Sequence, residues 1–314
     1  MSFSYREERR GQRVLDILTN DDAGVRMAVS RLGAELVSLA RMRGDEWVGY
    51  LHRDNDITPP TAGWANHATV MGYFLHRLKD GRSLYRGTEI AGGTHSFLRG
   101  KEWHFNGSDA VNGVLSYEIR QEDFTSTEYP LNVSLVLSYT FVGESIRVTF
   151  RFQNHDPELA AHVGFGMHPG FALTASAPPS FRMRAGTYRR YFSPTNYLSA
   201  ETQTFYFAGG QMPFEREKLP GSFILELVDV PERNFLFTDA PSGRAIDFDL
   251  TEVPYLTLWS DGGAFLCVEP CWGLTDHDVQ RAFENKEGIQ VIAAGGILQK
   301  SFTMTPLLNL AQNA

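Results

Sequence analysis

The stretch Asn132–Asn154, NVSLVLSYTFVGESIRVTFRFQN, contains in two runs the pattern that recurs through this chain. Apolar residues occupy every second position on both sides of Val142-Gly143-Glu144. Such alternation is typical of strands with one buried face, and a short glycine-containing turn between two alternating runs is typical of a hairpin. The segment therefore predicts two adjacent antiparallel strands.

Runs of the same kind, separated by Gly, Pro, Asn and Asp, extend outward from this hairpin in both directions. They cover residues 25–29, 34–40, 115–122, 223–228, 234–239, 245–250, 255–260, 265–269, 289–293 and 299–305. Helical patterns are few: Asp276–Glu284 is interpreted as a short helix or a turn, and Ala62–His76 as a segment that holds another helix. Many strands with almost no helix predict an all-β protein, a large β-sandwich or a barrel.

Composition narrows the class of protein. The 314 residues carry a net charge of −8, and the densest basic stretch, Arg6–Arg13, includes two glutamates. Nucleic-acid binding needs clustered Lys and Arg, and no run approaches the roughly 18 apolar residues of a membrane span. With no linker or low-complexity stretch, we expect a single domain over residues 1–314 that has neither a nucleic-acid nor a membrane partner.

Cysteine content and the first residues indicate the compartment. Cys267 and Cys271 are the only cysteines, which excludes a disulfide scaffold and favours two free thiols. Met1–Gln12 is polar and lacks the apolar segment of a secretion signal. We therefore expect a cytoplasmic protein, either a monomer or a homodimer.

Two segments place a titratable side chain at the end of a predicted strand. His168 lies in Val163–Phe171, VGFGMHPGF, between glycines and a Pro-Gly pair. Glu269 ends the apolar run in Ala264–Gly273, AFLCVEPCWG, where apolar neighbours are expected to raise its pKa toward a value useful for proton transfer. The alternatives are a histidine packed in a turn and a glutamate in an ion pair. Loops at strand ends often carry functional sites, which favours function for both.

Further candidates share the ability to bind hydroxyl groups or the apolar face of a ring. His95 and Arg99 lie in Gly93–Gly100, Arg77 follows His76, and Trp259 shares one strand face with Tyr255. The alternatives are solvated loops for the polar residues and a core position for the tryptophan. Neither HxH nor HExxH spacing occurs, and nucleotide-binding motifs are absent. We therefore expect no metal and no cofactor.

The order of these segments resembles the aldose 1-epimerase, or galactose mutarotase-like, family. The resemblance extends from about Gly33 to the end of the chain. Arg77–Gly81 is similar to the family's arginine-bearing segment, and His95–Arg99 is similar to its HGFxR-type motif. Gly166–Phe171 resembles the histidine motif, and Cys267–Gly273 resembles the catalytic glutamate motif. Ala293–Gly296 resembles the family's last turn. Ser96 stands where the family usually has glycine, and the substrate-binding aspartate of the galactose-type enzymes has no clear counterpart between Phe223 and Asp239.

This resemblance implies a supersandwich fold and a cofactor-independent mutarotase that interconverts the anomers of a small sugar. Glu269 would be the general base and His168 the general acid, acting from opposite sides of the sugar, while Arg77 and His95 contact it. Arg99 and Trp259 are added to the predicted substrate contacts from their residue types.

Three other functions stay open at this stage. A phosphosugar (hexose-6-phosphate) 1-epimerase would need extra arginines near the cleft, for which Arg99, Arg189 and Arg190 are candidates. A non-catalytic carbohydrate-binding protein would keep the cleft without turnover. A glycosidase needs two carboxylates at a set separation, and only Glu269 stands out, so it ranks last. The identity of the sugar is not predicted.

Overall fold

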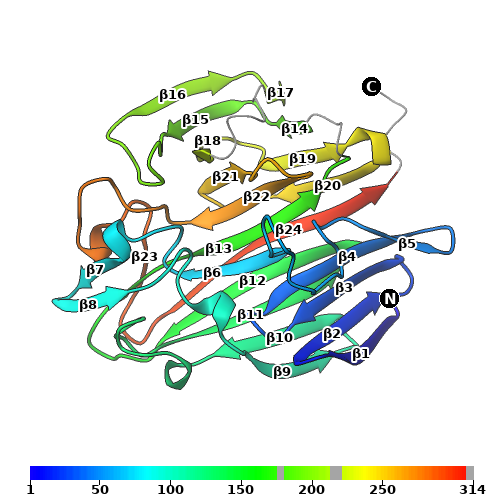
Figure 1. Ribbon diagram of the computed structural model, residues 1–314, viewed down its shortest axis with the longest axis horizontal. Helices are drawn as coiled ribbons and strands as arrows, with labels where there is room; N and C mark the ends of the chain where they lie inside the picture. Colours follow the sequence, from blue (N-terminus) through cyan, green and yellow to red (C-terminus); the bar gives the residue numbers. More distant parts are fainter. Residues whose placement is uncertain (175–179, 213–220, 309–314) are drawn as a thin grey trace.

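The computed structural model describes residues 1–174, 180–212 and 221–308 (Figure 1). Strands joined by loops and short 3-10 turns make up this part of the chain, and it contains no α-helix. The prediction of an all-β protein is therefore confirmed. No helix among these residues is long and apolar enough to span a membrane.

The largest sheet has nine antiparallel strands in the order β17-β14-β19-β20-β24-β12-β11-β10-β9. Its strands are β9 (His104–Asp109), β10 (Val114–Ile119), β11 (Val133–Val142), β12 (Ser145–Asn154), β14 (Ser180–Met183), β17 (Gly210–Gln211), β19 (Asn234–Asp239), β20 (Arg244–Asp249) and β24 (Ile297–Leu308). The predicted hairpin is its centre: β11 and β12 pair along their full length, from Val133↔Asn154 to Val142↔Ser145.

Two further sheets cover one face of this layer. One has the order β16-β15-β18-β21-β22-β13-β23, with β6 also paired to β13; the other runs β1 to β5, drawn in blue in Figure 1. The first comprises β6 (Ala68–Tyr73), β13 (Ala161–Ala172), β15 (Gly186–Tyr191), β16 (Thr202–Phe207), β18 (Phe223–Asp229), β21 (Tyr255–Trp259), β22 (Phe265–Trp272) and β23 (Gln290–Ile292). The second comprises β1 (Phe3–Arg10), β2 (Arg13–Asn20), β3 (Val25–Ser30), β4 (Glu35–Arg43) and β5 (Glu46–Gly49). A small hairpin, β7 (Arg82–Tyr85) with β8 (Thr88–Ala91), lies apart.

The core fills the space between the layers and is rich in aromatic rings. Phe165 of β13 lies 5.2 Å from Phe150 and 4.7 Å from Phe152 of β12, measured between ring centroids, and stacks on Trp272 of β22. Tyr139 of β11 donates its hydroxyl hydrogen to the carbonyl of Ala34, which joins the five-stranded sheet to the same layer. Each strand thus turns one set of alternate residues to the core, and residues between them on β13 and β22 face away from it.

The prediction of a helix within Ala62–His76 was wrong, because this segment contains strand β6. Every residue of β6 is buried, so both faces are covered and no alternation marks it as a strand. In Asp276–Glu284 the turn alternative holds, with one 3-10 turn at Phe283–Asn285. Asp276 bonds through its backbone to Arg77 and Leu198 instead of forming a helix.

Candidate active site

Neighbouring strands place His168 and Glu269 opposite each other. The antiparallel pairs Gly166↔Cys271 and Gly170↔Cys267 flank them on β13 and β22. Counting two residues inward from either pair brings His168 directly across from Glu269, and cross-strand partners project from the same face of a sheet. The Nε2 atom of His168 and the Oε1 atom of Glu269 are 3.2 Å apart.

Both residues lie within strands, so the prediction that each stands at the end of a strand was wrong. The sequence suggested strand ends, because a proline follows each residue. The prolines interrupt only the β13–β22 ladder, since β6 stays paired to β13 as far as Pro169 and β21 stays paired to β22 across Pro270. The prediction that the two side chains act from opposite sides of a sugar was also wrong, because they stand side by side.

Burial controls the charge of this pair. Glu269 is 1% exposed and His168 is 5% exposed. Removal from water raises the pKa of Glu269 well above its ordinary value, as its apolar neighbours predict, and lowers the pKa of His168 to about 3. Burial therefore favours the uncharged form of each group, and the two side chains stand close together at 3.2 Å.

The pair opens onto a cavity of about 450 Å³ on the face of β13 and β22 that points away from the core. This volume lies within the range of small-molecule sites. The six residues singled out from the sequence all line it: Glu269, His168, Arg77, His95, Arg99 and Trp259. The fold thus gathers segments that are far apart in the chain around one hollow.

His95 is held as a neutral hydrogen-bond donor. Its Nδ1 atom accepts the backbone N–H of His76 at 3.2 Å, and its own backbone N–H donates to the His76 carbonyl at 2.7 Å. Burial lowers the pKa of His95 well below its ordinary value. A neutral ring whose Nδ1 accepts must carry its hydrogen on Nε2, so His95 offers one N–H at the cavity.

The arginines differ in what they contact. Arg77 and Arg99 are exposed, line the cavity and form no ion pair with any residue that the structure describes. Arg189 is paired with Glu226 at 2.9 Å. Arg190 lies over the rings of Phe192 and Phe223. Of Arg99, Arg189 and Arg190, the arginines predicted for phosphate binding, only Arg99 lines this cavity. Arg77, which was predicted as a sugar contact, also lines it.

Two indole rings form a wall beside the pair. Trp64 lies 5.0 Å from His168 and Trp259 lies 5.6 Å from it, measured between ring centroids. The backbone N–H of Trp64 donates to Asp261. A Cβ atom on Gly170 would overlap the Trp64 ring, so this glycine, two residues after His168, is needed for close packing and not for a turn.

Several cavity residues escaped the sequence analysis. Trp64, Asn66, Ser193, Asn196 and Asp261 line the hollow. They lie in loops outside every recognised motif, and nothing in the spacing of the sequence marks them. Only the single Trp64 beside a glycine, outside any alternating run, offered a weak signal.

Ser96, the departure from the family's glycine, has a left-handed backbone with φ of +64°. Glycine adopts this conformation without strain, whereas a residue with a Cβ atom does not. The buried Ser96 hydroxyl also finds no hydrogen-bond partner in the described part of the chain. The loop therefore keeps a glycine-type geometry despite the serine.

Comparison with known proteins gives consistent results. The aldose 1-epimerase family profile matches residues 16–271. Among solved structures, the fold is similar to a galactose mutarotase related enzyme from Lactobacillus acidophilus, with a TM-score of 0.79 and 19% identity over 98% of both chains. A galactose mutarotase-like protein from Lactobacillus casei gives 0.79 and 17% over 97% of this chain and 100% of the other. One from Clostridium acetobutylicum gives 0.69 and 14% over 98% of both. No curated protein matches. At these identities the structural likeness concerns the fold.

Proposed function

The chain belongs to the aldose 1-epimerase family, and on that premise we propose that it is a mutarotase that interconverts the α and β anomers of a sugar. The observation that carries the proposal is the contact between His168 and Glu269 at the wall of a sugar-sized cavity. Glu269 serves as general base and His168 as general acid. The reaction needs only proton transfer, so the two side chains suffice.

The side-by-side arrangement suits the chemistry of a cyclic sugar. Ring opening removes a proton from the hydroxyl oxygen on C1 and adds one to the ring oxygen. Both oxygens are bonded to the same carbon, so the acid and the base must reach neighbouring atoms. Two cross-strand side chains separated by 3.2 Å meet that requirement better than groups on opposite faces.

The pair holds one proton in two arrangements of equal total charge. A neutral carboxyl beside a neutral imidazole interconverts with a carboxylate beside an imidazolium when that proton moves across the contact. Burial favours the first arrangement in the empty cavity. The Oε2 atom of Glu269 lacks a partner among the described residues, so a sugar hydroxyl that donates to it would stabilise the carboxylate.

From the second arrangement the step balances. Glu269 takes the proton of the C1 hydroxyl, the bond between C1 and the ring oxygen breaks, and His168 gives its proton to the ring oxygen. The products are an open-chain aldehyde, a neutral carboxyl and a neutral imidazole. After rotation about C1–C2 the reverse sequence closes the ring on the other face. The Nε2–H of His95, with Arg77, Arg99 and Trp259, would hold the remaining hydroxyls and the ring face.

One experiment tests the assignment. Glu269→Gln keeps the shape of the side chain but cannot accept the proton, so the catalysed rate of anomer exchange should fall by about 10²–10⁴-fold. Exchange measured by NMR on free hexoses and pentoses, after subtraction of the spontaneous rate, gives the value. A rate near that of the wild type would contradict the role of Glu269. Sugar binding by the wild type without exchange would instead identify a binding protein.

A phosphosugar is the second candidate substrate, favoured by the guanidinium groups of Arg77 and Arg99 at the cavity, for which the described ranges of the chain offer no ion-pair partner. Guanidinium groups match phosphate geometry. If the substrate carries a phosphate, the wild type should prefer a hexose 6-phosphate over the free hexose, and Arg99→Ala should remove the preference by raising KM with little change in kcat. Equal kcat/KM for both forms would exclude this candidate.

A further inference from the structure

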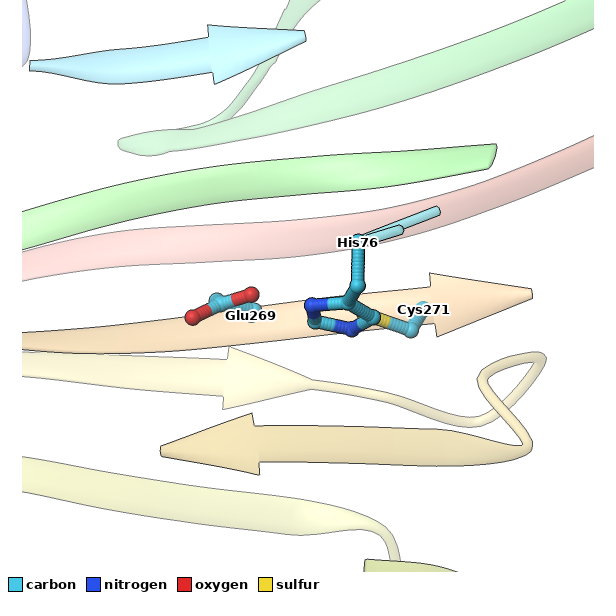
Figure 2. A group of neighbouring side chains, drawn as sticks. All are labelled: His76, Glu269 and Cys271. Carbon is cyan, nitrogen blue, oxygen red and sulfur yellow. The ribbon is translucent and has the colours of Figure 1, made fainter. Parts of the chain in front are cut away.

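A histidine, a glutamate and a cysteine meet on the inner side of the proposed active site. Glu269 and Cys271 are two residues apart on β22 and therefore share a face of the sheet. His76 comes from the loop after β6, and Figure 2 shows its ring between the other two side chains. One ligand atom from each residue lies within 4.8 Å of the other two.

Two of these groups have lone pairs without a partner in the part of the chain that the structure describes. The Nε2 atom of His76 and the Oε2 atom of Glu269 are buried and have no hydrogen-bond partner within the described ranges of the chain. Cys271 is a fully buried free thiol. Buried polar atoms are normally paired, and unpaired ones mark strain, catalysis or a binding site for a water or an ion. Glu269 has a catalytic explanation, but the unpartnered nitrogen of His76 does not, and among the described residues the Cys271 thiol beside it has only Thr257 as a hydrogen-bond neighbour.

We propose that His76, Glu269 and Cys271 form a binding site for a divalent metal ion of the zinc type. Imidazole nitrogen, carboxylate oxygen and thiolate sulfur together are ligands of Zn²⁺ and Co²⁺, whereas Mg²⁺ and Ca²⁺ prefer oxygen alone. Bonds of about 2.0–2.3 Å place tetrahedral ligands about 3.5 Å apart, so the three side chains must close by roughly 1 Å. Binding displaces two protons, one from the Cys271 thiol to solvent and one from the Glu269 carboxyl to His168 or to solvent, and it leaves a thiolate and a carboxylate on the metal.

The ion has a path to the site, because His76 and Glu269 both line the cavity. A tetrahedral ion with three protein ligands keeps one position for water, and here it would face the hollow. The spacing of the sequence did not reveal the cluster, since His76 is far from β22 along the chain. Only the packing of the β6 loop against the sheet brings the three residues together.

Metal binding has a functional consequence that rests on the proposed mutarotase activity. A coordinated Glu269 carboxylate can no longer accept a sugar proton, so Zn²⁺ is an inhibitor that competes for the catalytic base. Cys271 does not line the cavity, and its substitution should leave the metal-free rate unchanged. Cys267, also two residues from Glu269 on the same strand face but outside the cluster, provides a matched control.

The test uses Co²⁺ as a spectroscopic probe on the full chain. The wild type and Cys267→Ala should both develop a thiolate-to-cobalt charge-transfer band, and Cys271→Ala should not. Changes around a metal site cost about 10–100-fold in affinity, and His76→Gln should weaken Co²⁺ binding by at least that factor. This second variant keeps the site testable if Cys271→Ala does not fold.

Inhibition of anomer exchange by Zn²⁺ is an independent test of the metal site. Zn²⁺ should inhibit anomer exchange by the wild type and by Cys267→Ala, and at the same concentration should leave Cys271→Ala active. Absence of the band in the wild type, or its persistence in Cys271→Ala, would overturn the site. A band without any measurable exchange activity would leave the metal site standing and remove the proposed function instead.

Discussion

At the scale of single residues, the shared proton of His168 and Glu269 predicts an unusual pH dependence. In the proposed mechanism the protonation of the pair as a whole determines activity, and burial lowers the pKa of His168 to about 3 while it raises that of Glu269. A second proton is therefore added only near pH 3, and the shared proton is lost only well above the ordinary pKa of a carboxyl group.

We accordingly expect kcat/KM to stay level through pH 6.5. A solvated histidine that acts as the acid would lose its proton near that pH, and kcat/KM would then fall as the pH rises. Anomer exchange measured by NMR from pH 4.5 to 7.5 checks this. A decline centred near pH 6.5 would show that His168 titrates as a free imidazole.

Ser96 supplies a stability prediction at the same scale. Ser96→Gly removes a left-handed serine and a buried hydroxyl without a described partner. Relief of the backbone strain stabilises the folded state by about 1–2 kcal/mol. Glycine makes the unfolded chain more flexible, which costs about 0.5–1 kcal/mol, so the variant should be more stable by roughly 1 kcal/mol. Urea unfolding measures the change. Ser116→Gly, on extended strand β10, is the control and should be less stable; a loss in both variants would contradict the strain argument.

At the scale of elements, strand β13 depends on the glycine two residues after His168. A methyl group in Gly170→Ala would displace the Trp64 ring, which packs against His168 and Phe265. Overpacking of this kind costs about 1–3 kcal/mol, and kcat/KM should fall together with a change in tryptophan fluorescence. Gly93→Ala is the control, because a Cβ atom there meets no neighbour. Equal behaviour of the two variants would show that Trp64 adapts without cost.

The strands explain why the site is made of alternate residues. Thr69 of β6, His168 of β13, Glu269 of β22 and Thr257 of β21 are successive cross-strand neighbours by register. A shift of one residue in any pairing would turn the side chain on that strand into the aromatic core. Phe165 and Trp272, which face the opposite layer, hold that register by packing between the sheets.

At the scale of the whole molecule, a buried ion pair joins loops from distant parts of the chain. Lys286 contacts Asp276, and both side chains are 1% exposed. Asp276 also accepts the backbone N–H of Lys79 through its carboxylate and that of Leu198 through its carbonyl. The pair thereby ties together the rims of the cavity that carry Arg77 and Asn196.

Removal of one partner leaves an unpaired buried charge. Lys286→Met should lower the free energy of unfolding by about 3–5 kcal/mol. The same substitution at Lys101, whose ion pair with Glu128 is a quarter exposed on each side, should cost less than about 1 kcal/mol. Chemical denaturation of both variants measures the difference, and similar losses would mean that the buried pair has no special structural role.

Much of the protein could be predicted from the sequence because the signals are local. Alternation along Asn132–Asn154 is a property of neighbouring residues, and it determined the hairpin and the all-β class. The motifs around His95, His168 and Glu269 are also local, and they carried the family, whereas β6 was missed because burial on both faces removes the alternation. That the chain is a single domain stays a prediction.

The arrangement of the chemistry was decided only by the tertiary structure. Strand alternation says which face a side chain occupies but not which strand lies beside it, so the contact of His168 with Glu269 follows from register. The approach of Trp64 to Gly170 and of His76 to Cys271 depends on loops whose positions are set by packing between sheets. Residue types and periodicity are determined along the chain, whereas distances across it arise only when the layers close on their common core.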